Sequence, residues 1–141
     1  MNNELKIQVS VDIDVPTEKV WDALTNPEII KQYLFGTETK SDWKIGSRLI
    51  FEGEWQGKHY KDEGTILNIE PNKTLEYKYW SAFSGLENKP ENYSHLTFTL
   101  QGKSPVVLQL NQRGFVNEAS AKHSEQNWNQ VFGKIKELCE K

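Results

Sequence analysis

Near the carboxyl end of the chain, one stretch carries apolar residues at helical spacing. They fall at relative positions i, i+3, i+4, i+7, i+10 and i+11, as Trp128, Val131, Phe132, Ile135, Leu138 and Cys139. This stripe predicts a long amphipathic helix with one buried face. Asn117, Ser120 and Ser124 could each cap its start, so the sequence leaves the first turn open. The stripe must be buried against another element, and the rest of the chain has to supply that surface.

Most of the chain before this helix alternates apolar and polar residues, as strands with one solvated face do. The alternation is clearest over residues 5–13. In four later segments, apolar residues have all-odd or all-even numbers and would therefore lie on one face of a strand. They are Leu49/Phe51/Trp55, Leu75/Tyr77/Tyr79, Leu96/Phe98/Leu100 and Val106/Leu108/Leu110. Between Ile66 and Ile69 the apolar residues change from even to odd positions within one run, which predicts a β-bulge there. Turn sequences such as Gln56-Gly57 recur at hairpin intervals, so we expect about six antiparallel strands over residues 37–113 and a long loop over 81–92.

Two short helices are predicted between the first strand and the others. Pro16 ends the strand and suits the first turn of a helix, where its missing N–H costs nothing. Asn26-Pro27-Glu28 gives a second helix start, with Asn as the cap and Glu at the positive helix end. Gly36 is expected to end this second helix.

These elements predict one α+β domain over residues 1–141, since the length suits a single domain and the sequence shows no linker or repeat. An antiparallel sheet with one apolar face needs a cover, and the C-terminal helix is the element long enough to provide it. Sheet twist should curl the strands around that helix, with the two short helices closing one end.

Composition excludes several classes of function. The chain has 17 basic and 20 acidic residues, a net charge of −3, which lacks the positive footprint of a nucleic-acid-binding protein. The one cysteine, Cys139, allows no internal disulfide and is expected to be buried. The N-terminus lacks a signal-peptide pattern, and no apolar run approaches the roughly 20 residues of a membrane span. We therefore expect a cytoplasmic protein without membrane contact, and no motif predicts a cofactor or a metal.

Aromatic residues give the strongest indication of a site. Apolar pockets with a few polar groups are typical of small-molecule binding, and a buried tyrosine hydroxyl needs a partner. The candidate ligand-binding residues, predicted to point between sheet and helix, are Phe51, Trp55, Tyr77, Tyr79, Phe98, Leu110, Gln112, Trp128 and Phe132. The same residues could instead fill a solid core, and the sequence leaves both possibilities open.

Catalytic candidates are few. His95 is the one histidine for which a proton-transfer role can be suggested. It would lie on the opposite face of its strand from the apolar Leu96, which favours a solvated position. Asp62 and Glu63 are neighbours in a strand, face opposite ways and are expected to be hydrated edge charges. Trp21 and Trp43 are expected to pack rather than to contact a ligand.

Several segments resemble, in chain order, the motifs of a known family. Residues 15–28 are similar to the family's opening motif, in which a proline ends the first strand and the pattern VW-x-AL-T-x-PE follows. Residues 43–46 are similar to its W-x-x-G turn. Residues 64–71 are similar to a hairpin segment of the family that begins with glycine and ends with proline. Gln112-Arg113-Gly114-Phe115 and the tail containing Trp128 are similar to its closing segments. These motifs resemble homologues of the activator of the 90-kilodalton heat-shock chaperone's ATPase, in the START-like (SRPBCC) superfamily.

The resemblance implies the helix-grip fold that the element pattern also predicts. It also implies a binding module that holds an apolar or amphipathic small molecule between the sheet and the C-terminal helix. One alternative is a co-chaperone-like module that contacts a chaperone in a stress response. A second alternative is a cyclase-like or hydrolase-like enzyme, for which His95 would be the acid or base. We favour the binding module, in which no catalytic residue is assigned.

Overall fold

The order of elements is that of a strand, two short helices, six strands and a long helix. The computed structural model describes residues 1–103 and 105–141. In chain order its elements are β1 (Asn2–Ile13), α1 (Thr17–Thr25), α2 (Pro27–Tyr33), β2 (Glu38–Ser41), β3 (Arg48–Trp55), β4 (Lys58–Glu70), β5 (Thr74–Trp80), the 3₁₀ turn η1 (Pro90–Asn92), β6 (Ser94–Gln101), β7 (Val106–Phe115) and α3 (Glu118–Cys139).

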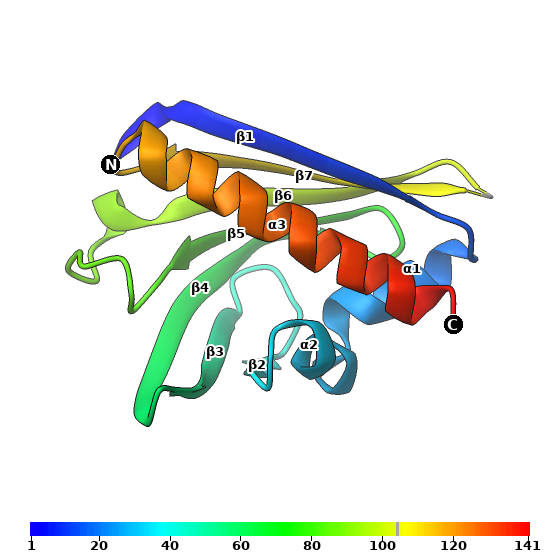
Figure 1. The fold of residues 1–141 in the computed structure, drawn as a ribbon, viewed down its shortest axis with the longest axis horizontal. Coiled ribbons are helices and arrows are strands. Elements are labelled where there is room, and N and C mark those ends of the chain that lie inside the picture. Colours follow the sequence, from blue (N-terminus) through cyan, green and yellow to red (C-terminus); the bar gives the residue numbers. More distant parts are fainter. Residues whose placement is uncertain (104) are drawn as a thin grey trace.

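The strands form one antiparallel sheet in the order β1-β7-β6-β5-β4-β3-β2. Each strand from β2 to β7 pairs with its neighbour in sequence, and β1 joins the far edge beside β7. The sheet is strongly curved, and α3 lies across its concave side close to β1 (Figure 1). The predicted helix-grip fold is confirmed, with α1 and α2 at one end of the curl.

Two local predictions from parity and turn chemistry are confirmed in the β3–β4–β5 region. The register of β4 against β5 shifts between Ile66 and Asn68, which is the predicted bulge. The β3–β4 hairpin turns through Gln56 at φ 52° and Gly57 at φ 78°. Two consecutive left-handed residues are typical of a type I′ turn, whose twist matches that of the flanking strands.

The helices begin where side chains can cap them. The Asn26 side chain accepts a hydrogen bond from the Glu28 N–H at 3.0 Å, with Pro27 in the first turn of α2. Of the three possible starts for α3, Asn117 is the cap, accepting from the Ser120 N–H at 2.8 Å. This resolves the choice that the sequence left open.

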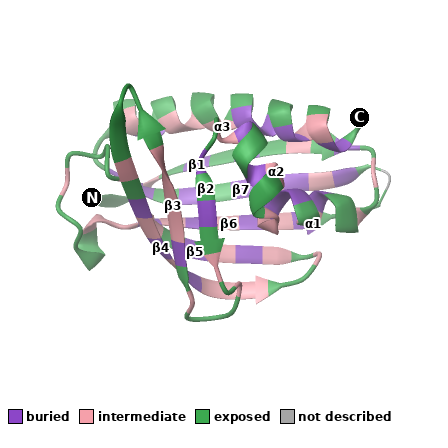
Figure 2. Cartoon of the chain, turned by 90° about the horizontal axis from the view of Figure 1, so that it is seen from below, coloured by how far each residue is buried: buried purple, intermediate pink, exposed green. Residues whose placement is uncertain are grey.

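The core lies between the concave face of the sheet and the inner face of α3. Buried residues of α3 face the strands, whereas its outer side is exposed (Figure 2). Cys139 is buried in this core, as expected. In the described part of the chain, no helix is long and apolar enough to cross a membrane.

Candidate ligand-binding cavity

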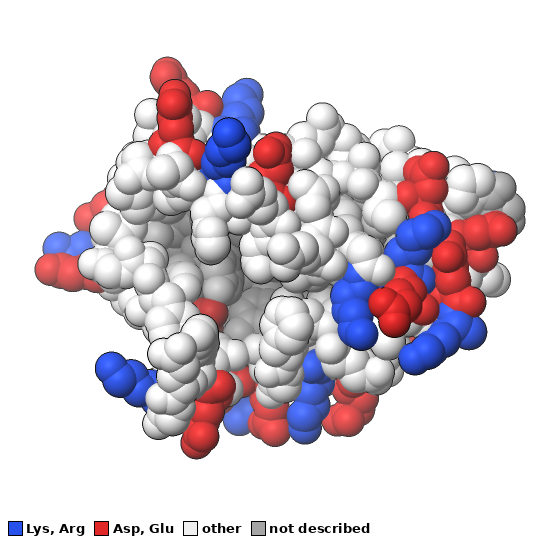
Figure 3. Space-filling model, viewed as in Figure 1, with Lys and Arg blue, Asp and Glu red and all other residues white. Residues whose placement is uncertain are grey.

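The core does not fill the whole space under α3. A cavity of about 910 Å³ lies between α3, the concave face of β3 to β6 and the end of α2. Pockets for small ligands usually have about 300–1,000 Å³. The space-filling view shows this face hollowed, with largely uncharged walls (Figure 3). Of the two possibilities left by the sequence, a solid core and an open cavity, the structure shows the open cavity.

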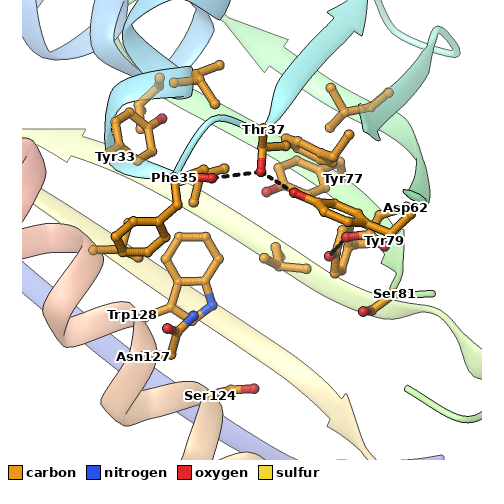
Figure 4. Close-up of a pocket in the computed structure, with 18 of the residues that line it drawn as sticks. Tyr33, Phe35, Thr37, Asp62, Tyr77, Tyr79, Ser81, Ser124, Asn127 and Trp128 are labelled. Atoms are coloured by element: carbon orange, nitrogen blue, oxygen red, sulfur yellow. Dashed lines mark hydrogen bonds between the residues drawn. The ribbon is translucent and has the colours of Figure 1, made fainter. Parts of the chain in front are cut away.

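Aromatic rings form most of the cavity wall and contact one another. Tyr77 stacks on Phe98 with ring centroids 5.9 Å apart, and Phe98 meets Trp128 edge-on at 5.6 Å. Phe51 meets Tyr79 edge-on at 5.8 Å. The rings come from three strands and α3, because alternate residues of each strand point to the concave side. A ligand would therefore be enclosed by aromatic surface from both the sheet and the helix (Figure 4).

Asp62 is the deepest charged group at the cavity. Only 7 % of its surface is exposed, and its two carboxylate oxygens accept from the Tyr79 hydroxyl at 2.5 Å and from the Ala82 N–H at 2.8 Å. Loss of solvation raises the pKa of this carboxyl above its usual value, although both hydrogen bonds oppose the shift. The expectation that Asp62 is a hydrated edge charge is wrong, because its cross-strand partner is the inward-facing Phe51.

Tyr77 presents a second polar group to the cavity. The residue is buried, and its hydroxyl makes no hydrogen bond with any described part of the chain. Burial raises the pKa of this phenol, so it remains an O–H donor at neutral pH. The nearby Tyr33 hydroxyl, by contrast, donates to the Ala23 carbonyl at 2.8 Å. Tyr77 therefore has a free donor and acceptor for a ligand, whereas Tyr33 is already engaged.

Gln112 is committed to the protein rather than to the cavity. Its amide oxygen accepts from the Trp128 indole N–H at 3.0 Å, and its amide nitrogen donates to the Ser94 hydroxyl at 2.9 Å. Ser94 in turn donates to the carbonyls of Arg113 and Gly114. This chain of hydrogen bonds orients the Trp128 ring on α3 against the sheet.

Exposed apolar side chains surround the mouth of the cavity. Phe35, Trp55 and Phe83 are 84 %, 47 % and 60 % exposed, and all three belong to its lining. Beside them, the Thr37 and Tyr60 hydroxyls lie 2.5 Å apart, and Thr37 also donates to the Leu34 carbonyl at 2.7 Å. We call Phe35, Trp55 and Phe83 the mouth residues.

The structure brings seven of the nine candidate ligand-binding residues to the cavity. The seven that line it are Phe51, Trp55, Tyr77, Tyr79, Phe98, Gln112 and Trp128. Leu110 and Phe132 are completely buried in the core and do not line it. His95 also lies elsewhere, on the opposite face of β6, with its Nε2 2.5 Å from a carboxylate oxygen of Glu76. His95 is therefore not placed to act as an acid or base in this cavity, whereas the carboxyl of Asp62 borders it.

Sequence reasoning missed several residues of the cavity. Trp43, which was expected only to pack, belongs to the lining, as do Thr37, Tyr60 and Asp62. For Tyr60 and Asp62 a signal was present, since both share the parity of the inward-facing Ile66. Among the described residues, no three His, Cys, Asp or Glu side chains are grouped so that they could hold a metal ion.

A curved antiparallel sheet wrapped around a C-terminal helix, with a cavity between them, defines a helix-grip protein of the START-like class. More narrowly, the chain belongs to the family described as Activator of Hsp90 ATPase homolog 1-like protein, whose family model matches residues 14–140. No curated protein sequence matches this chain.

Solved structures agree with this assignment. A solution structure of a protein from Cytophaga hutchinsonii is 45 % identical, with a TM-score of 0.84, and the match covers 98 % of this chain and 95 % of that one. A crystal structure from Mesorhizobium loti is 29 % identical, with a TM-score of 0.77 and coverage of 95 % and 96 %. The Aha1 dimer from Colwellia psychrerythraea is 18 % identical, with a TM-score of 0.73 and 96 % coverage of both chains, and shares the fold.

Proposed function

We propose that the protein binds an apolar or amphipathic small molecule in the cavity under α3. The observation that carries this proposal is the cavity itself, of about 910 Å³, with a mainly aromatic wall and a few polar groups at defined positions. Binding of a ligand would remove apolar surface of the ligand and of the cavity from water. Each Å² buried contributes roughly 25 cal/mol to the binding free energy, before the cost of ordering the ligand. Tyr77 would fix the ligand's orientation, because its hydroxyl has no partner in the described part of the chain.

The experiment uses the tryptophans that line the cavity as reporters. Trp43, Trp55 and Trp128 all contact this space, so a bound molecule should change the intrinsic fluorescence. Titration with a panel of lipids, sterols and flavonoids is expected to give saturable changes for at least one class. If no compound changes the fluorescence or the melting temperature, the proposal is wrong.

A matched pair of variants shows whether binding occurs in the cavity. Ser124 lies on α3 and lines the cavity, so Ser124→Phe places a ring in the ligand's space (Figure 4). Gln126→Phe adds the same ring to an exposed position of the same helix. Ser124→Phe should weaken binding at least tenfold, whereas Gln126→Phe should bind as the unchanged protein does. Equal binding by both variants would place the ligand elsewhere.

The family description suggests a second function, contact with a 90-kilodalton heat-shock chaperone. The mouth residues Phe35, Trp55 and Phe83 offer an exposed apolar surface that such a contact could cover. Chaperone pull-down and ATPase measurements test this function. Complex formation that the triple replacement by Ser abolishes would support it, and no complex with the unchanged protein would reject it.

A further inference from the structure

We propose that the ligand of this cavity carries a basic amine, and that its ammonium group pairs with the carboxylate of Asp62. This inference rests on the proposed binding function and specifies the chemistry of the ligand's polar end. It follows from the charges of the lining, the hydrogen bonds of Asp62 and the rings around that residue.

The charged lining residues all have the same sign. Glu54 and Asp62 are acidic, and none of the described residues that line the cavity is Lys, Arg or His. A carboxylate or phosphate headgroup would meet repulsion here without any compensating cation. An ammonium group would instead meet opposite charge at Asp62, whose burial leaves the attraction only weakly screened. The lining therefore selects for cationic over anionic amphiphiles.

Asp62 retains capacity for a further partner. Each of its carboxylate oxygens accepts one hydrogen bond, from Tyr79 or from Ala82, and each can accept another. Within the described part of the chain, Asp62 forms no ion pair. A buried carboxylate without a cation is costly, and a ligand ammonium would provide both the charge and the N–H donors.

The rings beside Asp62 suit a cation as well. Phe51 is the cross-strand partner of Asp62, and the Tyr79 ring, whose hydroxyl donates to Asp62, meets Phe51 at 5.8 Å. Aromatic faces attract ammonium groups, most strongly where the site is shielded from water. An alcohol gains neither the ion pair nor this attraction, so comparison of an amine with an alcohol isolates the effect of charge.

The test compares dodecylamine, dodecanol and dodecanoate at neutral pH, the two ions below their micelle-forming concentrations and the alcohol below its solubility limit. Their shared chain holds the apolar contribution constant. With the unchanged protein, we expect the amine to bind about tenfold or more tightly than the alcohol, and the carboxylate to bind most weakly. A carboxylate that binds as tightly as the amine would overturn the inference and leave the proposed binding function intact. Failure of all three probes to bind would count against the binding function itself.

Asp62→Asn keeps the shape of the side chain and removes the charge. Its amide oxygen can still accept from the Ala82 N–H, while its NH2 replaces the oxygen that accepts from Tyr79. This variant should lose the affinity gap between amine and alcohol. The control is Glu70→Gln, which removes a carboxylate from the exposed end of the same strand, and it should keep the gap. If Asp62→Asn keeps the preference for the amine, Asp62 is not the partner. A melting curve of each variant confirms that the fold is retained, and the ranking of probes on the unchanged protein stands independently of both variants.

Discussion

At the scale of single residues, Asp62 and Gln112 show opposite uses of a buried polar group. Gln112 has both ends of its amide satisfied by Ser94 and Trp128, so it serves the structure. Asp62 is held by Tyr79 and the Ala82 backbone, but its carboxyl borders a largely apolar space. The first arrangement stabilises the fold, whereas the second lowers stability, as expected for a group that serves the proposed ligand.

The raised pKa of Asp62 makes a definite prediction about stability and pH. Because the folded protein binds this proton more tightly than the unfolded chain does, stability from this group is fully present below the ordinary pKa of 3.8 and is lost as pH rises through the folded-state pKa. Asp62→Asn should therefore be more stable than the unchanged protein at neutral pH, with a smaller difference in acid. Urea unfolding at several pH values checks this. A variant that is less stable at neutral pH would show that the hydrogen bonds outweigh desolvation.

Gln112→Leu should destabilise the protein by about 1–3 kcal/mol, since it leaves the Trp128 indole N–H without a partner and removes the bond that the Ser94 hydroxyl accepts. Gln109→Leu is the control, because Gln109 lies on the same strand and its parity opposes that of Gln112. It should change the free energy of unfolding by much less. Denaturant melts of the two variants provide the measurement, and equal losses would show that the Gln112 hydrogen bonds contribute little.

At the scale of elements, parity predicted most strands and turn chemistry predicted the hairpins. The strand β2 could not be found this way, because its four residues carry no apolar alternation and pair only at the sheet edge. Asp62 was expected on the solvated side of the sheet because it is charged. The pairing of β4 with β3 instead sets it opposite the inward-facing Phe51. Local pattern thus predicted the elements well, but which polar residues face inward depended on strand pairing.

Two glycine-to-alanine changes should have opposite signs. A Cβ on Gly64 of β4 would lie 2.4 Å from the Lys78 carbonyl oxygen of β5, so Gly64→Ala must push these strands apart. We expect a loss of about 1–3 kcal/mol. A Cβ on Gly133 of α3 would meet nothing within 4 Å, so Gly133→Ala should gain about 0.5–1 kcal/mol from helix propensity. Thermal melts of both variants check this, and a harmless Gly64→Ala would mean that the strands separate easily there.

At the scale of the whole molecule, the sequence predicted the wrapping of sheet around helix but not the space left inside. The inward aromatic set was recognised, yet its residues suit a filled core equally well. The cavity arises because α3 lies along β1, at one edge of the sheet, while the curved strands β3 to β5 bend away beneath it (Figure 1). That separation depends on the curvature of the whole sheet, which no local pattern specifies.

A ligand in this cavity should stabilise the entire fold, because it contacts the sheet, α2 and α3 at once. At a concentration one hundred times its dissociation constant, a ligand that binds only the folded state adds about 2.7 kcal/mol. The melting temperature should therefore rise steadily with ligand concentration. Scanning calorimetry tests this, and Ser124→Phe should show a much smaller rise. Binding without a rise would mean that the ligand also binds the unfolded chain.

The position of α3 after all seven strands also affects how the chain is made. On the ribosome, the aromatic concave face would be synthesised before the helix that covers it. At roughly 5–20 residues per second, the 22 residues of α3 take about one to four seconds to add. Until α3 is in place the aromatic concave face lacks its cover, and a small amphiphile or a holding chaperone could occupy it.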